Sequence, residues 1–271
     1  MKNNLALIKM GGSVATHKAR PLSANYSAIE GFSKAISLIK EVPIILVHGG
    51  GSFGHYWSVK YNMHTRPDNY DTNGISIVHE SMIKLNQIIA HSLIKNGLNP
   101  YPVSAFALSI GNKPLTTKIK QLYTMARTGL LPVTFGDAIH INNGNYSILS
   151  GDVIMTMIAK TLNPSRVIFA VNTDGVYKNK ESRKAIPELT RGDITNCRLF
   201  RSRTTSENIA DITGGMGRKV KEALRISSRG IDVMIVNGLK AERITEAVLA
   251  GPENFEGTVI RGRTKRLGKR K

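Results

Sequence analysis

Residues 5–13, LALIKMGGS, pass from an apolar run into a glycine turn, and this passage indicates the fold class. The run is apolar except for Lys9, which predicts a buried strand that ends in a tight loop. Successive backbone N–H groups at Gly11, Gly12 and Ser13 can form an anion-binding turn, because glycine lets the backbone approach a ligand closely. A lysine within a buried strand is costly unless it meets a fixed anion. Lys9 therefore favours a phosphate site over a plain turn with an exposed lysine.

Beyond this segment, strands and helices alternate along the chain. Apolar runs predict strands at 42–47, 130–134, 166–171 and 232–236, and helical spacing predicts helices at 25–40, 75–96, 153–162, 217–229 and 241–250. This alternation predicts an α/β fold, a three-layer sandwich with a largely parallel central sheet whose strand ends bind ligands. No linker rich in Pro, Gly or Ser divides the chain. We therefore expect a soft division into two lobes, 1–152 and 153–261, and a solvated basic tail at 262–271.

A second glycine segment, HGGGSFGH, spans residues 48–55 and follows the second expected strand. It satisfies G-x-G-x-x-G, but the ribose-binding acid expected about 20 residues later is poorly placed, which weakens a dehydrogenase interpretation. It also contains half of a P-loop, yet His55 and Tyr56 stand where that motif has Lys and Ser or Thr. A phosphate-binding turn is the interpretation that survives. We expect His48 to close the strand structurally and His55 to contact the ligand.

A third glycine segment, TGGMGRK at 213–219, is predicted to open a helix whose first turn carries Lys219. Its alternative is a glycine turn with a solvated lysine. Asp152, after Ser150 and Gly151, lies at a loop-to-helix junction and could be an ordinary N-cap. The segment NTDGVY at 172–177 has turn composition at a strand end and could hold a nucleotide or nothing.

The overall charge is strongly basic. The chain has 38 Lys and Arg against 19 Asp and Glu, a net charge of +19, and seven of the basic residues lie in 261–271. This excess favours anionic partners in general, but no nucleic-acid module is recognisable outside the tail. Cys197 is the single cysteine and cannot form an internal disulfide. No run is long enough to span a bilayer, so we expect no membrane insertion and, by default, a cytoplasmic protein.

Taken in order, these segments resemble the amino-acid kinase family. The resemblance extends from Leu5 to about Arg261 and rests on Lys9-x-Gly-Gly-Ser, Ser-Gly-Asp152, Thr-Asp174-Gly-Val-Tyr and Thr-Gly-Gly-Met-x-x-Lys219. Within the family, the segment 48–55 and the ending FEGTVIR resemble the isopentenyl phosphate kinases. The implied activity is ATP-dependent phosphorylation of isopentenyl phosphate to isopentenyl diphosphate in isoprenoid biosynthesis. ATP and Mg²⁺ are the implied cofactors, no protein side chain is assigned to the metal, and relatives suggest a homodimer.

The resemblance also implies roles for individual residues. Lys9 and Lys219 would contact the transferring phosphoryl group, Asp152 would orient them, and Lys18 would stabilise the transition state from the acceptor side. The acceptor phosphate would be held by Gly50, His55 and Gly151. The nucleotide site would be formed by Lys9, Gly11, Gly12, Ser13, Gly51, Asn172, Asp174, Tyr177, Gly214, Gly215, Met216, Gly217 and Lys219. An acceptor monophosphate is already largely ionised at neutral pH, since its second pKa is about 6, so no general base is required.

The apolar end of the acceptor requires an apolar pocket. By resemblance, Ile75, Val78, Ala138 and Ile148 would face it, although each could equally be ordinary core. Because Ala138 is small, the pocket could admit a chain somewhat longer than five carbons. Two other functions stay open: a kinase for fosfomycin or another small phosphate or phosphonate, and a basic nucleic-acid-binding protein that acts through its tail.

Overall fold

The computed structural model describes residues 3–17, 19–111, 113–178, 182, 184–190 and 210–262. The strands are β1 Asn3–Met10, β2 Ile44–His48, β3 Pro100–Val103, β4 Ser109–Ile110, β5 Lys113–Pro114, β6 Leu131–Phe135, β7 Asp137–Asn142, β8 Asn145–Leu149, β9 Pro164–Val171, β10 Glu188–Leu189, β11 Val233–Asn237 and β12 Thr258–Ile260. The helices are α1 Gly12–Ala15, α2 Tyr26–Ser37, α3 Gly51–Lys60, α4 Thr72–Lys95, the 3₁₀ turn η1 Ala105–Leu108, α5 Thr116–Arg127, α6 Gly151–Leu162, α8 Ala210–Ser227 and α9 Ala241–Leu249.

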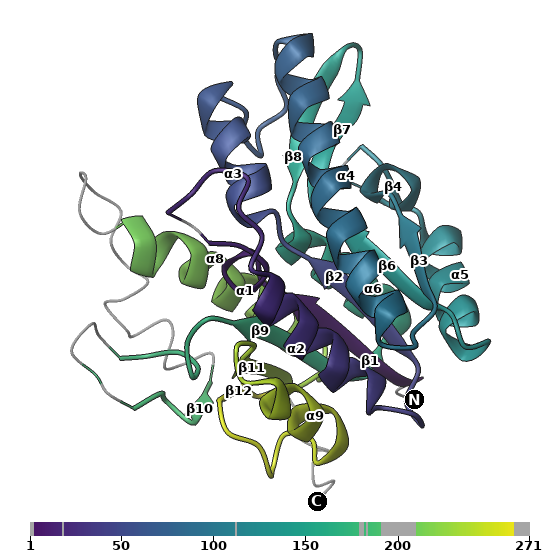
Figure 1. Cartoon of the computed structure of the whole chain (residues 1–271), viewed down its shortest axis with the longest axis vertical. Coiled ribbons are helices and arrows are strands. Elements are labelled where there is room, and N and C mark those ends of the chain that lie inside the picture. Colours follow the sequence, from purple (N-terminus) through teal and green to yellow (C-terminus); the bar gives the residue numbers. More distant parts are fainter. Residues whose placement is uncertain are drawn as a thin grey trace, which may run out of the picture.

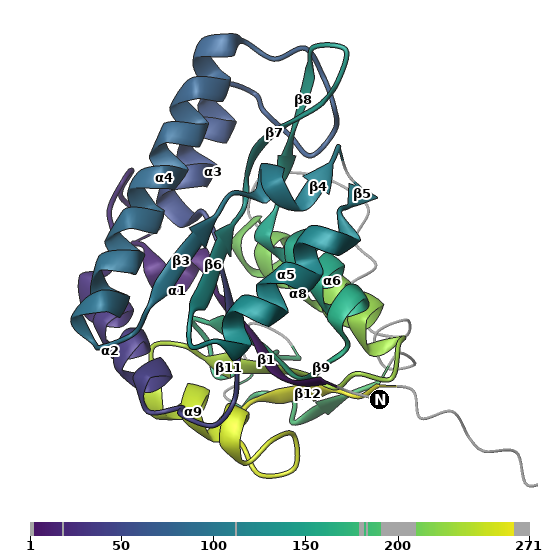
Figure 2. The same ribbon diagram turned by 90° about the vertical axis from the view of Figure 1, so that its right-hand side faces the viewer.

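One large sheet forms the middle layer. Its strand order in the described residues is β10-β12-β11-β9-β1-β2-β6-β3, and all neighbouring pairs are parallel except β11 and β12. Helices α2, α4 and α9 cover one face, and α5, α6 and α8 cover the other (Figures 1 and 2). The expected three-layer α/β sandwich is therefore confirmed. The two expected lobes share this continuous sheet through the pairing of β1 with β9, and their division at residue 152 stays a prediction.

Side chains of the central strands alternate between the two helix layers, as the period of two in a strand requires. In β1, Leu5 and Leu7 pack in the cluster under α5, α6 and α8, whereas Ala6 and Ile8 pack under α2 and α9. Lys9 continues the first series, so its side chain lies on the face covered by α6. The central strands are largely buried on both faces, which is why their sequences are mostly apolar.

A separate hairpin of β7 and β8 projects beyond the large sheet, beside α3 and α4 (Figure 2). The hairpin begins directly after Gly136, which follows β6. Ser150 then connects the end of β8 to the start of α6. The sequence interpretation gave no residue ranges for this hairpin, for α3 or for α5. Among the described residues, no helix combines the length and the apolar character that crossing a bilayer requires.

The third glycine segment differs from the expectation. Helix α8 begins at Ala210, before Gly214, so the glycines lie inside the helix and Lys219 is not in its first turn. The expected helix start at Gly217 is wrong. The later part of α8 buries Val220, Ala223 and Ile226 in the core, and such packing overrides the low helix propensity of glycine.

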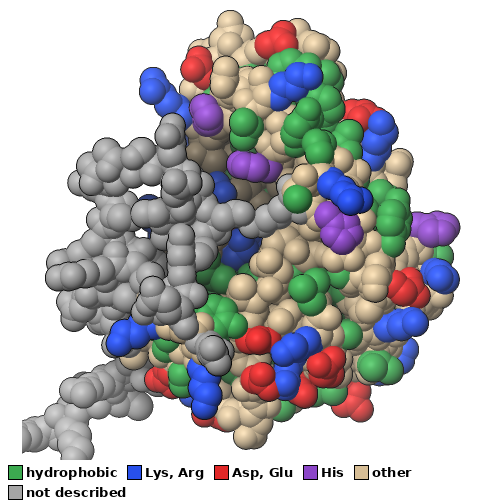
Figure 3. All heavy atoms as spheres, turned by 60° about the vertical axis from the view of Figure 1, so that its left-hand side comes forward, with side chains coloured by type: hydrophobic (Ala, Val, Ile, Leu, Met, Phe, Trp, Pro, Cys, Tyr) green, Lys and Arg blue, Asp and Glu red, His purple; other side chains and the backbone are tan. Residues whose placement is uncertain are grey.

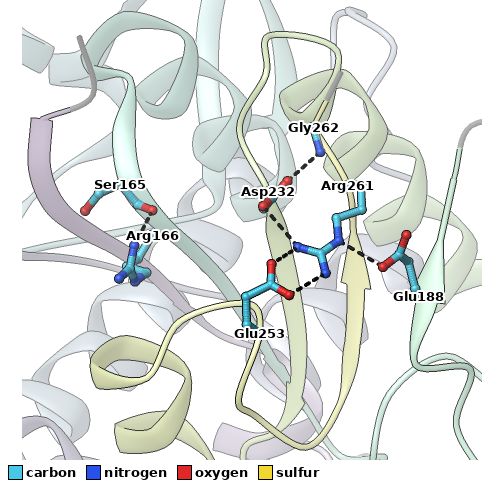
Figure 4. Close-up of polar contacts among 7 residues, drawn as sticks. All are labelled: Ser165, Arg166, Glu188, Asp232, Glu253, Arg261 and Gly262. Carbon is cyan, nitrogen blue, oxygen red and sulfur yellow. Dashed lines mark hydrogen bonds and ion pairs between the residues drawn. The ribbon is translucent and has the colours of Figure 1, made fainter. Parts of the chain in front are cut away.

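The final strand is held by a cluster of charged side chains around Arg261 (Figure 4). The guanidinium donates from Nε to Glu188 Oε2 at 2.9 Å and from Nη1 and Nη2 to the two carboxylate oxygens of Glu253 at 2.6 and 3.1 Å. Asp232, which precedes β11, accepts from Arg261 Nη1 at 3.5 Å and from the backbone N–H of Gly262 at 2.6 Å. These contacts join β10, β11 and β12 at the edge of the sheet. The basic tail beyond Gly262 lies outside the described residues.

His48 closes β2 and is fully buried, which fits the structural role expected for it. Its ring stacks on Phe135, its Nδ1 lies 3.2 Å from the carbonyl oxygen of Gly49, and its Nε2 lies 3.1 Å from Asn86 Nδ2. The carbonyl can only accept, so Nδ1 carries the proton and Nε2 accepts from the amide. Burial lowers the pKa of His48 to about 4; the hydrogen bond with Gly49 raises it in part, and the charge of Lys9 contributes a smaller lowering. The imidazole is therefore neutral near pH 7.

Leu46 in the buried part of β2 tests the packing of the sheet. We expect Leu46→Ala to lower the free energy of unfolding by about 2–5 kcal/mol, because it leaves a cavity between the sheet and the helices. The matched control is Ile94→Ala, whose side chain is exposed on α4, and it should change stability by less than about 0.5 kcal/mol. Denaturant unfolding measures both, and similar values for the two variants would contradict the assigned core.

His48 also predicts a pH dependence of stability. Between its ordinary pKa of 6.5 and about 4, the unfolded chain binds a proton that the folded chain does not, so stability falls as the pH is lowered through this window. The loss attributable to His48 is on the order of 3 kcal/mol. We expect His48→Gln to flatten this part of the profile when unfolding is measured from pH 7 to pH 4. Parallel profiles for the two proteins would show that folding does not lower the pKa of His48.

Candidate active site

The site lies at the carboxyl ends of the central strands, where β1 has β2 on one side and β9 on the other. In parallel sheets, such a change of direction in strand order leaves a crevice for ligands. Here the crevice opens into a cavity of about 1520 Å³, lined by loops that follow β1, β2, β6 and β9 and by α3, α4, α6 and α8. The face shown in Figure 3 is hollowed, with basic side chains inside the hollow and histidines at its rim.

Lys9 and Asp152 form a buried ion pair at the base of this cavity. Lys9 is 4% exposed and Asp152 is 5% exposed, and the ammonium donates directly to Asp152 Oδ1. Asp152 is placed in the first turn of α6, whose N-cap is Ser150: the Ser150 hydroxyl accepts from Val153 N at 3.3 Å. Asp152 is therefore not the cap itself, and its carboxylate is free to meet Lys9.

The carboxylate of Asp152 stays ionised despite its burial. Burial alone would raise its pKa, but the charges of Lys9 and Lys219, the hydrogen bond from Lys9 and the charge of Arg218 together lower it. Lys219 also donates from Nζ to the carbonyl oxygen of Gly215 at 3.1 Å. The cations Lys9 and Lys219 therefore surround the single carboxylate of Asp152. This excess of positive charge suits a site for phosphate groups.

The first two glycine loops pack directly on each other. A Cβ built on Gly12 would lie 2.3 Å from Gly51 N, and one built on Gly49 would lie 2.7 Å from Gly12 N. Gly51 adopts φ +48°, a conformation that favours glycine, and its neighbour Ser52 donates from its backbone N–H to Thr16 Oγ1 at 2.9 Å. This close approach explains why both loops are glycine-rich, and it brings the two loops together at one wall of the cavity.

Gly151 packs closely against the Lys9 side chain and the end of β2. A Cβ at this position would lie 3.2 Å from Lys9 Cε and 3.1 Å from the carbonyl oxygen of His48. Glycine at 151 therefore leaves the room that the Lys9 side chain needs to reach Asp152.

Most residues predicted for the site line the cavity. Those that do are Lys9, Gly12, Ser13, Gly50, Gly51, His55, Val78, Ile148, Gly151, Asp152, Asn172, Tyr177, Gly215, Met216, Gly217 and Lys219. His55 lies in the second turn of α3 and is exposed to the cavity. Lys18 lies outside the described residues.

Five predicted residues are placed otherwise. Gly11 packs under the loop, where a Cβ would lie 2.6 Å from the carbonyl oxygen of Ala170. Asp174 does not line the cavity, because its Oδ1 accepts from Asn237 Nδ2 at 2.8 Å and Lys240 Nζ at 2.9 Å, contacts that lower its pKa. Gly214 lies within α8. Ile75 and Ala138 belong to a small apolar cluster behind the cavity wall.

The cavity includes residues that the sequence interpretation missed. Met63, His64, Thr65, Met82 and Asp137 line its outer part. Asp137 follows Gly136 at the carboxyl end of β6, and this position could have identified it as a site residue. Met63, His64 and Thr65 belong to a loop without a recognisable motif. Thr156, one turn after Asp152, donates from Oγ1 to the buried Glu222 at 2.7 Å and so joins α6 to α8 behind Lys219.

Comparison with known proteins agrees with this geometry. The sequence pattern of the amino acid kinase family matches residues 4–237. The chain is 33% identical to an isopentenyl phosphate kinase of Thermoplasma acidophilum over 95% of its own length and all of that protein. It is 26% identical to an isopentenyl phosphate kinase of Methanothermobacter thermautotrophicus and 26% identical to an acetylglutamate kinase of Endomicrobium trichonymphae, each over 96% of this chain and 100% and 99% of those proteins.

Solved structures show the same relationship. The crystal structure of the T. acidophilum isopentenyl phosphate kinase product complex superposes with a TM-score of 0.76 at 29% identity and covers 95% of this chain and 100% of that one. An isopentenyl phosphate kinase substrate complex gives a TM-score of 0.75 at 29% identity, with 94% and 100% coverage. The resemblance inferred from the motifs is confirmed. This chain belongs to the amino acid kinase family and is a phosphotransferase.

Proposed function

We propose that this enzyme transfers the γ-phosphoryl group of ATP to isopentenyl phosphate and so forms isopentenyl diphosphate for isoprenoid biosynthesis. The observation that carries the proposal is the composition of its single continuous cavity. One part contains the Lys9–Asp152 pair, Lys219 and the glycine loops, and the other contains Met63, Val78, Met82 and Ile148. A phosphate with a short apolar chain matches both parts, and the isopentenyl phosphate kinases among the relatives support this acceptor.

The reaction requires charge neutralisation more than covalent help from the protein. An oxygen of the acceptor phosphate attacks the γ-phosphorus in line, the bond to the bridging oxygen breaks, and ADP leaves with that bond's electron pair. The acceptor oxygen is already ionised, so no base removes a proton. Lys9 and Lys219 reduce the repulsion between the two phosphates, and Asp152 holds the Lys9 ammonium in place. Lys18 is proposed for the acceptor side of the same transition state.

Each glycine loop has a part in binding. We assign the acceptor phosphate to the backbone N–H groups of Gly50 and Gly151 and to the His55 side chain. The nucleotide is assigned to the loop at 11–13, Gly51, Asn172, Tyr177 and the helical segment 214–217 together with Lys219. Asp174 would act indirectly, by holding Lys240 and Asn237 beside the segment 172–177.

Mg²⁺ would accompany the nucleotide and add positive charge at the transferring phosphoryl group. No group of three or more His, Cys, Asp or Glu side chains suited to a metal occurs among the described residues. A phosphate-bound Mg²⁺ fits this site, since that ion commonly keeps its waters and takes few protein ligands. Asp152, which is paired with Lys9, would lie beside the phosphates that carry the metal.

The remaining alternatives are open to direct tests. A kinase for fosfomycin or another small phosphonate would use the same phosphate-binding loops but would not need the apolar wall. Nucleic-acid binding through the tail concerns residues outside the described ranges, and deletion of 262–271 should remove it without loss of kinase turnover. A homodimer, a cytoplasmic location and the two-lobe division stay predictions.

The first test follows ADP release from purified protein with Mg·ATP and isopentenyl phosphate. We expect turnover, and we expect His55→Ala to lower kcat/KM for the acceptor by about 10- to 100-fold, because a hydrogen bond to a charged phosphate is lost. His91→Ala, an exposed histidine on α4, serves as the control and should match the wild type. Turnover of fosfomycin but not of isopentenyl phosphate would establish the alternative acceptor.

The second test concerns the buried ion pair. Asp152→Asn keeps the size of the side chain but removes the charge that holds Lys9, so we expect kcat to fall by about 10²- to 10³-fold. KM for ATP should change much less, because the glycine loops that bind the nucleotide are intact. Steady-state kinetics with both substrates varied measures the two effects separately. A variant with near wild-type kcat would contradict the role assigned to Asp152.

A further inference from the structure

The hairpin of β7 and β8 forms one wall of the apolar part of the cavity, and its two edges are held differently. On the β8 edge, the backbone N–H of Ile148 donates to the carbonyl oxygen of His64 at 2.9 Å, and Tyr146 exchanges two backbone hydrogen bonds with Asp68 at 2.9 and 3.0 Å. Ser147 Oγ adds a bond to the carbonyl oxygen of Thr65 at 2.9 Å. This edge is therefore fixed by the loop that follows α3.

The β7 edge faces α4 and is held by one polar pair. His79 Nδ1 of α4 lies 2.6 Å from Asp137 Oδ2 of β7, and in the described ranges this is the side-chain hydrogen bond that joins α4 to the hairpin. Asp137 is 2% exposed and lines the cavity, and its other oxygen accepts from Ala138 N at 2.7 Å. The His79 side chain is about half exposed, so the pair connects a buried carboxylate to the surface.

Each member of the pair stabilises the charged form of the other. Burial raises the pKa of Asp137, and the hydrogen bond and charge of His79 counteract that rise. The hydrogen bond to Asp137 raises the pKa of His79, although burial opposes it. Without His79, the Asp137 carboxylate would lose one of its two partners in a buried position. A buried carboxylate with an unsatisfied oxygen is strongly disfavoured. The structure around Asp137 would therefore have to open to water, or the carboxylate would have to take up a proton.

The pair lies directly beside the apolar cavity wall in both elements. Val78 precedes His79, and Ala138 follows Asp137, and these two side chains pack together with Met63 in a small buried cluster. That cluster is separate from the two large cores that flank the sheet. The separation between α4 and the hairpin is consequently controlled by a few apolar contacts and by this one polar pair.

We propose that His79 and Asp137 are positioning residues that hold α4 against the hairpin and thereby select acceptors by the bulk of their apolar chain. The inference rests on the proposed function, because it concerns the apolar half of the acceptor site. The pair acts through Val78 and the hairpin wall, whereas phosphate binding belongs to Lys9, Lys219 and the glycine loops. Loss of the pair should widen the apolar half and leave the nucleotide half unchanged.

The kinetic experiment compares isopentenyl phosphate with geranyl phosphate, a longer apolar chain. In His79→Ala and Asp137→Asn, we expect the ratio of kcat/KM for the short acceptor to that for the long one to fall by about tenfold, since a widened pocket loses contacts with the short chain. KM for ATP should stay within about twofold of the wild-type value. His79→Gln keeps a hydrogen-bond donor at this position and should restore part of the selectivity.

The matched control is Glu80→Gln, which removes a neighbouring ion pair with Lys84 on the exposed side of the same helix. It should leave the acceptor ratio unchanged. An unchanged ratio in folded His79→Ala and Asp137→Asn proteins would overturn the proposal. An equal loss of activity for both acceptors and for ATP would overturn it too, because it would indicate general damage rather than a wider pocket.

Amide hydrogen exchange provides a readout that needs no substrate. In His79→Ala, we expect faster exchange within residues 137–149 while β1, β2 and β9 exchange as in the wild type. Unchanged exchange in the hairpin would show that the pair does not hold it. If the wild-type enzyme turned over neither acceptor, the proposed function would be wrong and acceptor selection would fail with it, whereas faster hairpin exchange would still establish the structural role of the pair.

Discussion

The burial of the Lys9 ammonium against the Asp152 carboxylate is the interaction on which the rest of the site depends. A lone charge at the centre of a sheet would be strongly disfavoured, so the strand that carries Lys9 and the helix that carries Asp152 must meet. Alternation along β1 turns Lys9 toward the α6 face, and glycine at position 151 leaves room for its side chain. The pairing of this buried cation with Asp152 thereby holds the first turn of α6 against the sheet.

The first two glycine loops pack very closely against each other. Gly12 and Gly51 approach so closely that any side chain on Gly12 would collide with backbone, and the positive φ of Gly51 belongs to this contact. The approach places both loops on one wall of the cavity, in positions that are set by packing within the protein. His48, buried and neutral behind the loops, supports them without adding another charge.

The apolar half of the cavity is supported by different parts of the structure. Its wall belongs to a small hairpin and to α4, and the cluster behind it is separate from both large cores. A wall with few supports can change its position without disturbing Lys9 and Lys219, since Lys9 is anchored in the sheet and Lys219 in α8. Such a division is consistent with relatives that share the family and are named for different acceptors.

Local sequence determined the features that depend on neighbouring residues. The apolar runs of β1, β2, β9 and β11 and the glycine turns at their ends follow from periodicity and turn chemistry. These segments also predicted many of the residues that line the cavity. Tertiary structure decided the early start of α8, the diversion of Asp174 to Lys240 and the pairing of His79 with Asp137. These three features depend on packing between segments that are far apart in the chain. A local sequence pattern does not indicate which distant residues will be in contact.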